Sequence, residues 1–271
     1  MIRPILSFAI GIAALPTLTM PAPASAQDMI NNLPDYTSAW VMGDLMQRRG
    51  RDSGDTADSK TNRKPDPQAI LARQATYTPS AAVRTKVDSA FASYLAGRRP
   101  ASAPVLLRAL AADSPPGSAF TRLLAAELGN SEDAIRRQLQ QGQLQGDYGR
   151  WLTTMGYSDR NLFDVNTAFL MHSWSIANGG VTTRYPKITF RTVRDDLMEH
   201  QDPGRMAGRS NTLKQEEAQS FALFTALLVS AWENADTRER AVLSSGVAKL
   251  GKRIGIDYRQ VRLSAEGFAF R

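Results

Sequence analysis

The sequence predicts an all-α protein, with a single multi-helix bundle domain behind a signal peptide and a disordered linker. Two observations indicate this fold class. From about residue 80 to residue 254, apolar side chains recur at steps of three and four, which is the period of a helix with one buried face. Between these runs stand helix-breaking groups such as Pro115-Pro116-Gly117 and Gly179-Gly180. No internal repeat of fixed period is visible, so helix-on-helix packing is the natural architecture.

The first helices of the domain are marked by caps and by apolar steps. Thr78-Pro79-Ser80 offers a cap with Pro at the first helical position. The helix that follows ends at Gly97, and its apolar face consists of Val83, Val87, Phe91, Tyr94 and Leu95. Residues 103–112 and 118–128 predict two more short helices. Ser131-Glu132-Asp133 opens another, which we expect to be more exposed than its neighbours.

The middle of the domain contains one clear helix and one ambiguous stretch. Residues 147–156 form a short apolar element. Residues 161–178 predict a helix whose apolar face holds Leu162, Val165, Phe169, His172 and Ile176. Residues 181–192 are rich in β-branched and aromatic residues, which suits a strand. Pro186, Phe190, Val193 and Leu197 nevertheless fit the helical period, and we favour a helix from about residue 187.

The last third predicts the central helix of the bundle. Residues 202–212 are predicted to form a loop, and 213–235 form the best core helix in the chain. The apolar middle of that helix is too short for a membrane span, since charged residues flank it closely. Residues 237–254 predict the final helix. The ending alternates like an extended segment over 261–263 and 267–270, and we expect it to lie against the bundle.

The beginning of the chain has the layout of a secretory signal peptide. Arg3 supplies the positive charge, an apolar run of about a dozen residues follows, and Ala24-Ser25-Ala26 is a small-x-small cleavage site. That run is shorter than the roughly 20 apolar residues of a membrane anchor. We therefore expect export through the inner membrane with cleavage after Ala26, and no transmembrane segment in the mature chain.

Three further segments follow the predicted cleavage site. Residues 27–47 contain a short amphipathic segment with Tyr36, Trp40 and Leu45, which could dock on the main domain or on a partner. Residues 48–67 lack any large apolar residue, so we predict a disordered linker. The helical domain should occupy 68–271. The chain has no cysteine, which excludes disulfides and lipid attachment at the cleavage point.

The mature chain is basic. It loses only Arg3 on cleavage, which leaves a net charge of about +6 with ordinary side-chain pKa values. Such a surface favours anionic partners, although the same charge can reflect arginine-rich composition alone. The basic residues do not form a stripe, and no segment interleaves them with aromatic residues. We therefore expect no specific nucleic-acid partner, and an envelope protein or an anionic envelope polymer instead.

Four passages follow one another in a distinctive order: Tyr77-Thr78-Pro79-Ser80 with Val83-Arg84; 161–165 leading to Trp174 and Ala177-Asn178-Gly179; the long helix near 218–232; and the ending 256–268. In this order they resemble an uncharacterised family of exported, mostly helical bacterial proteins of unknown function. The resemblance spans most of residues 77–268. It implies an all-α fold, and it brings no activity, cofactor or catalytic residue.

The sequence contains no recognisable catalytic motif. A zinc site needs clustered ligands, whereas the only histidines, His172 and His200, are twenty-eight residues apart. Gly-x-Ser-x-Gly is absent, and no carboxylate pair can be assigned to glycoside hydrolysis. We expect no metal, no cofactor and no catalytic residue. His172 on an apolar helix face is more simply a core histidine.

One loose group of residues remains as a candidate groove: Tyr157, Arg160, Asp164, His172, Trp174 and Asn178. They come from one turn and one helix, and Asp164, Trp174 and Asn178 could line a groove at the helix ends. Capping by Asp159 or Asn161, together with core packing of Trp174, would explain the same residues without a ligand.

Three functions are compatible with these observations. The first is a non-catalytic periplasmic or secreted protein that binds a partner. The second is a hydrolase that acts on cell-wall glycan or peptide, which requires a carboxylate pair or His172 beside a carboxylate. The third is a membrane-active protein that inserts the helix near 218–232. The export signal, the basic charge and the lack of a catalytic motif favour the first.

Overall fold

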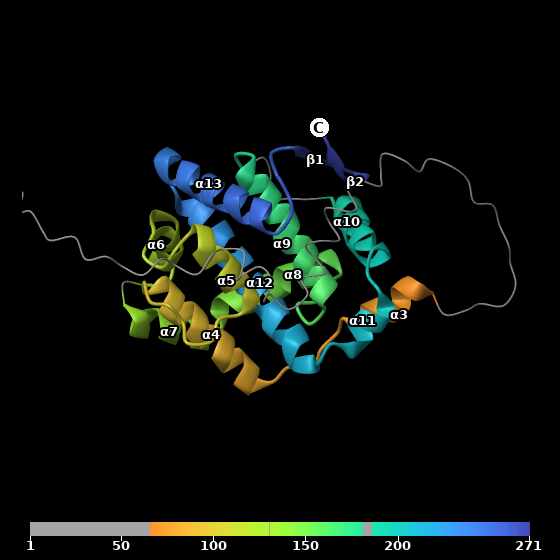
Figure 1. Ribbon diagram of the computed structural model, residues 1–271, viewed down its shortest axis with the longest axis horizontal. Coiled ribbons are helices and arrows are strands. Elements are labelled where there is room, and N and C mark those ends of the chain that lie inside the picture. The colour runs from red at the N-terminus through yellow and green to blue at the C-terminus, as the bar shows by residue number, and fades with distance from the viewer. Residues whose placement is uncertain (1–65, 130, 181–185) are drawn as a thin grey trace, which may run out of the picture. The chain divides into compact units, whose positions relative to one another are not determined.

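The computed structural model describes residues 66–129, 131–180 and 186–271, which fall in one of the two compact units of the chain (Figure 1). The predicted signal peptide, the segment 27–47 and nearly all of the linker lie outside the described residues. The elements are α3 (Pro67–Gln74), α4 (Ala81–Leu95), α5 (Val105–Asp113), α6 (Ala119–Ala126), α7 (Glu132–Gln141), α8 (Gln143–Met155), α9 (Leu162–Ala177), α10 (Lys187–Glu199), α11 (Pro203–Gly208), α12 (Asn211–Asn234), α13 (Thr237–Arg253), β1 (Val261–Ser264) and β2 (Gly267–Phe270). The prediction of a mostly helical domain is confirmed for this part of the chain.

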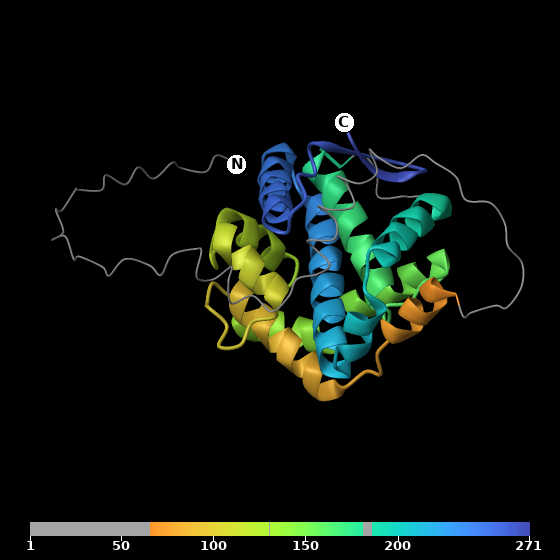
Figure 2. The ribbon, with the colours of Figure 1, turned by 45° about the vertical axis from the view of Figure 1, so that its right-hand side comes forward.

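Helices α9 and α12 run side by side at the centre of the bundle (Figure 2). Their contact is aromatic: the ring of Phe169 lies 4.6 Å from that of Phe221 and 5.9 Å from that of Phe224, centroid to centroid. Every residue of α9 is buried, which includes the predicted apolar face and the rest of the helix circumference. The hydroxyls of Thr167 and Thr225 each donate to the carbonyl one turn earlier, which lets polar side chains enter this core.

The central place of α12 bears on the membrane-active hypothesis. Leu223, Phe224, Leu227 and Leu228 are fully buried against neighbouring helices. None of the helices in the described ranges is long and apolar enough to cross a membrane. Release of α12 for insertion would therefore dismantle the core of the bundle, which argues against that hypothesis.

Two boundaries in the last third of the chain differ from expectation. Residues 202–212 were expected to form a loop, but Pro203–Gly208 form α11, because Asp202 caps its first turn and Pro203 occupies the first helical position. Helix α12 begins at Asn211, since the Ser210 hydroxyl accepts a hydrogen bond from the Leu213 amide. The predicted helix from about residue 187 is confirmed as α10, while 181–185 lie outside the described residues.

The C-terminal ending folds into an antiparallel hairpin against the bundle; the extended backbone was predicted from the alternation, and the pairing of the two strands was not. Strands β1 and β2 pair Val261 with Phe270 and Ser264 with Gly267. Two hydrogen bonds fasten the hairpin to helices: Trp174 Nε1 donates to the Val261 carbonyl at 3.0 Å, and Thr192 Oγ1 donates to the Ala265 carbonyl at 2.9 Å. The hairpin thus crosses the end of the bundle beside α9 and α10 (Figure 2).

Side-chain amides on the first turns of α12 hold the segment before α4 in an extended form. Asn211 donates to the Thr78 carbonyl and accepts from the Thr78 amide, each at 2.7 Å. Gln215 does the same with Ser80, each at 2.8 Å. The spacing matches, because four helical residues rise about 6 Å and two extended residues span about 6.6 Å. Helix α4 therefore starts at Ala81, and the prediction of Pro79 at its first position is wrong.

We call the paired hydrogen bonds of Asn211 with Thr78 and of Gln215 with Ser80 the amide clamp. Replacement of its buried member, Gln215, should destabilise the domain. Gln215 is fully buried, so Gln215→Leu leaves the Ser80 N–H and carbonyl without partners and should lower the free energy of unfolding by about 2 kcal/mol. Chemical denaturation followed by circular dichroism measures the change. Asn211→Ala is the matched control: Asn211 is exposed, water replaces its amide, and the loss should stay below about 1 kcal/mol. Equal losses of stability in the two variants would contradict the claim that the buried Gln215 amide contributes more than the exposed Asn211 amide.

Candidate functional site

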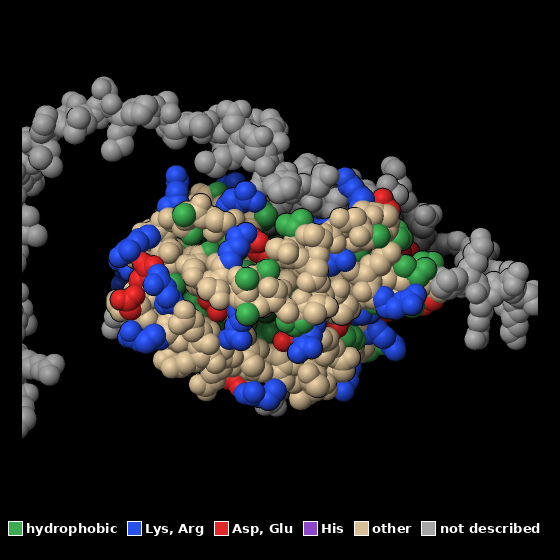
Figure 3. Space-filling model, turned by 90° about the horizontal axis from the view of Figure 1, so that it is seen from below, with side chains coloured by type: hydrophobic (Ala, Val, Ile, Leu, Met, Phe, Trp, Pro, Cys, Tyr) green, Lys and Arg blue, Asp and Glu red, His purple; other side chains and the backbone are tan. Residues whose placement is uncertain are grey.

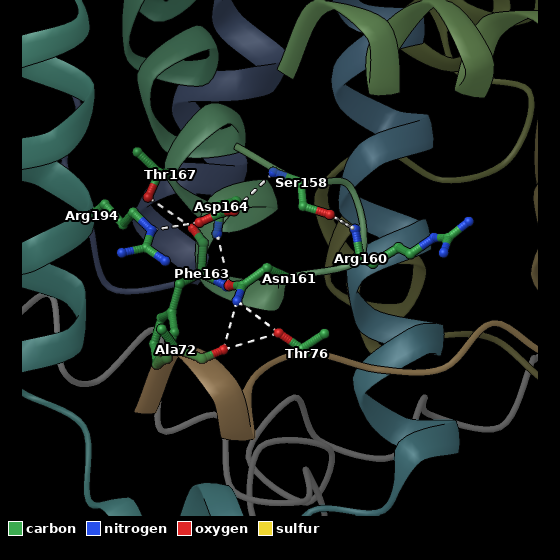
Figure 4. A network of polar contacts seen from close by, with 9 residues as sticks. All are labelled: Ala72, Thr76, Ser158, Arg160, Asn161, Phe163, Asp164, Thr167 and Arg194. Carbon is green, nitrogen blue, oxygen red and sulfur yellow. Dashed lines mark hydrogen bonds and ion pairs between the residues drawn. The ribbon is translucent and has the colours of Figure 1, made fainter. Parts of the chain in front are cut away.

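The N-terminus of α9 is fixed by an asparagine that bonds in both directions. Asn161 Oδ1 accepts from the amides of Phe163 at 3.0 Å and Asp164 at 3.4 Å, which caps the helix. Its Nδ2 donates to the Ala72 carbonyl at 2.7 Å and to Thr76 Oγ1 at 3.2 Å (Figure 4). The cap therefore ties α9 to α3 and holds the first turn of α9, including Asp164, in a fixed position.

Asp164 is a buried carboxylate with two donors. Its side chain is 6% exposed. One oxygen accepts from Arg194 Nε at 2.5 Å and the other from the Ser158 amide at 2.9 Å (Figure 4). Burial raises the pKa of this carboxyl above its ordinary value, whereas Arg194 and the Ser158 amide act to lower it. The carboxylate is committed to orienting Arg194 and the turn before α9.

Arg194 is held on its other side by an aromatic ring. Its guanidinium carbon lies 5.7 Å from the centroid of the Tyr157 ring, within cation–π range. Tyr157 in turn stacks on Phe190, with centroids 4.2 Å apart and planes inclined by 27°. Neither Nη of Arg194 donates a hydrogen bond to any of the described residues, and the side chain is 17% exposed. Two N–H-bearing nitrogens thus have no hydrogen-bond partner among the described residues.

The half-buried ring of Trp151 belongs to the same cluster of side chains as Tyr157 and Phe190. Trp151 meets the buried Phe190 edge-on, with centroids 6.4 Å apart, so Trp151 and Tyr157 both lie against Phe190. We name Trp151, Tyr157 and Arg194 the aromatic–arginine surface. Helix α8, the turn after it and α10 each contribute one of its three side chains.

His172 lies behind Trp151 and not in a groove. Their ring centroids are 5.1 Å apart, and His172 is 5% exposed. Burial lowers the pKa of its imidazole from 6.5 to about 4, so the ring is neutral at pH 7. The interpretation of His172 as a core histidine fits this position, and solvent has little access to the ring.

The six residues singled out from the sequence do not form one groove. Trp174 and Asn178 lie at the other end of α9, where Asn178 donates to the Tyr258 carbonyl and accepts from Arg271, so they hold the C-terminal hairpin. Fourteen residues of helix place Asn178 about 21 Å from Asp164. Arg160 is exposed and extends away from Asp164 (Figure 4). Trp174 and Asn178 form a separate pair at the far end of the helix, whereas Tyr157 and Asp164 come together on either side of Arg194.

Sequence reasoning missed the residue that joins this pair. Arg194 lies thirty residues after Asp164 and carries no motif, and nothing in the sequence showed that α10 would cross the start of α9. Among the described residues, no cluster of three or more His, Cys, Asp or Glu could hold a metal ion. No known protein family, curated protein or solved structure matches this chain.

Proposed function

We propose that this chain is an exported, non-catalytic binding protein that holds an anionic polymer of the bacterial envelope at the aromatic–arginine surface. The observation that carries the proposal is the orientation of Arg194. Its Nε is bonded to a buried carboxylate and its plane lies by a tyrosine ring, while both Nη groups remain without a partner among the described residues. An arginine held in this way is pre-organised to bind a planar anion.

The neighbouring side chains indicate what kind of anion fits. The two Nη groups match the two oxygens of a carboxylate and can form paired, charge-assisted hydrogen bonds. Trp151 and Tyr157 offer half-buried ring faces, which pack well against the C–H faces of sugar rings. Aromatic walls with a few fixed polar groups are typical of ligand sites. A glycan that carries carboxylate groups combines both features, and it belongs to the class of anionic envelope polymers.

The hydrolase alternative finds less support at this surface. Hydrolysis of a glycosidic bond needs a carboxylic acid that can exchange a proton beside a second carboxylate. Asp164 instead accepts from Arg194 and Ser158. His172 is buried behind Trp151, away from any bound polymer. Incubation of the purified protein with peptidoglycan should therefore release no soluble fragments, and measurable release would favour the hydrolase.

Replacement of Arg194 tests the proposed site directly. Arg194→Lys keeps the charge but loses the planar pair of Nη donors. The affinity for an acidic glycan should therefore fall about 30-fold, equivalent to about 2 kcal/mol. Calorimetric titration of the processed protein with carboxylate-bearing peptidoglycan fragments measures the effect. Arg160→Lys is the matched control, because Arg160 is exposed at the same end of α9 and extends away from Asp164. Unchanged affinity of Arg194→Lys would refute the site.

Export and the role of the tethered segment need a separate experiment. The signal-peptide pattern predicts export, and the apolar residues at 27–47 suggest that this segment contacts a partner. Fractionation should place the processed protein outside the cytoplasm. Crosslinking in the intact envelope should recover a defined partner, and deletion of residues 27–47 should weaken that capture. Capture that is unchanged by the deletion would remove the tethered segment from the proposal.

A further inference from the structure

One lysine of the described chain is buried. Exposed Lys and Arg side chains are scattered among Asp and Glu on the face seen from below, so an exposed cation by itself marks no site (Figure 3). Lys214 differs, because it is only 9% exposed and its ammonium has no ion pair or hydrogen bond with any described residue. Lysine is almost never buried without a partner, since its charge loses the stabilisation by water. The fold thus buries a cation for which the described part of the chain supplies no anion.

Arg209 brings a second cation to the same place. Its Nη1 lies 2.7 Å from Glu217 Oε2, and the two side chains are 23% and 13% exposed. Neither Nε nor Nη2 of Arg209 has an acceptor among the described residues. Burial lowers the pKa of the Lys214 ammonium, and the positive charge of Arg209 lowers it further, so the two cations act on each other. Glu217 balances one of the two charges, which leaves one positive charge in excess.

The first turn of α12 adds backbone donors. The amides of Asn211 and Thr212 have no acceptor in the part of the chain that the structure describes, and both residues are exposed. Lys214 comes three residues after Asn211, on the same face of the helix, and helical side chains lean toward the N-terminus. Its ammonium is therefore directed over this turn, where the partial positive charge of the helix end also favours an anion.

We propose that Lys214, Arg209 and the free amides of Asn211 and Thr212, named here the α12 anion site, bind a phosphate group. A phosphate dianion offsets the excess charge, and its oxygens can accept from the ammonium, the guanidinium and the amides together. A carboxylate has only two oxygens and one charge, so it satisfies fewer of these donors. The ligand is either inorganic phosphate or a phosphate ester. The inference goes beyond the proposed glycan site and does not depend on it, since the two sites share no residue.

Thermal unfolding and calorimetric titration test the role of the lysine. Inorganic phosphate should raise the Tm of the processed protein relative to chloride at equal ionic strength, because a ligand of the folded state stabilises that state. Lys214→Met keeps the apolar stem. Without phosphate this variant should be at least as stable as the wild type, since it buries no unpaired charge. Its affinity for phosphate should fall about 30-fold.

The matched control is Lys249→Met, which removes the charge of an exposed lysine on α13 and should keep the wild-type affinity. An unchanged affinity of Lys214→Met for phosphate would overturn the site. A loss of stability in Lys214→Met without phosphate would also overturn it, because the ammonium would then have a stabilising partner within the protein.

A proline at the first position of α12 tests the helix end. Asn211→Ala and Asn211→Pro both remove the Asn211 side chain from the amide clamp, but only the proline also removes the backbone N–H. Proline is accepted at the first helical position, and Ser210 before it is already extended. Asn211→Pro should therefore bind phosphate about fivefold more weakly than Asn211→Ala. Equal affinities of the two variants would overturn the part of the helix end in the site.

Titration with glycerol 1-phosphate separates the two sources of the phosphate group. Tighter binding than that of inorganic phosphate assigns the site to a phosphate ester, and weaker binding assigns it to free phosphate. If neither compound binds the wild type, the α12 anion site is overturned. Arg194→Lys should retain the binding of phosphate, so that this proposal and the glycan proposal can fail separately.

Discussion

Asp164→Ala should lower the free energy of unfolding by about 3–4 kcal/mol, because removal of one partner of a buried ion pair leaves the other charge uncompensated. The side chain of Arg194 is only 17% exposed, so its guanidinium gains little water when the carboxylate is lost. The Ser158 amide loses its acceptor as well. Denaturant titration followed by circular dichroism measures the change, and binding of the acidic glycan should weaken because Arg194 is no longer oriented.

A double variant separates the ion pair from general damage. Asp164→Leu with Arg194→Met removes both charges, so its loss of stability should be smaller than that of Asp164→Ala by about 2 kcal/mol. Glycan binding should nevertheless disappear, since the guanidinium of Arg194 is absent. If the double variant is as unstable as the single one, the cost comes from packing at the start of α9 and the carboxylate has no special role in holding Arg194.

The helices could be predicted because local chemistry marks their ends. Asp236 and Glu239 form a reciprocal capping box at the start of α13, and Gly142 adopts φ 70° between α7 and α8, where a side chain would be strained. The wrong prediction of a loop over 202–212 has a different cause. Asp202-Pro203 is itself a helix start, but a six-residue helix shows no apolar period from which to predict it.

The candidate site could not be predicted, because it depends on which helices meet. Helical spacing identified Phe190 and His172 as apolar-face residues, and both are buried. It did not show that Phe190 would separate Trp151 from Tyr157, or that Arg194 would reach Asp164. The extended clamp of Thr78 and Ser80 has the same origin, since Gln215 acts on a segment 135 residues away. Contacts of this kind depend on the tertiary arrangement, and one sequence carries no local signal for them.

Acidification should destabilise the domain through His172. The pKa of its imidazole is 6.5 in the unfolded chain and about 4 in the folded one. The unfolded state therefore takes up a proton first, and the folded state is favoured fully only above about pH 6.5. As the pH falls toward 4, this contribution is lost, which amounts to about 3 kcal/mol over the whole window. Stability measured by denaturant titration at stepped pH values should decline accordingly.

The variant His172→Gln isolates this contribution from the carboxylates that titrate in the same range. The side chain of Gln does not titrate, so the decline between pH 6.5 and pH 4 should be smaller in the variant by up to about 3 kcal/mol, even if Gln packs less well at every pH. His200→Gln removes the other histidine, which lies at the end of α10 with its Nδ1 2.9 Å from the Asp196 carbonyl, and should keep the wild-type decline because His172 is intact. Identical pH profiles for wild type and His172→Gln would mean that the ring takes up its proton equally well in both states. The acid sensitivity of the bundle would then come from its carboxylates alone.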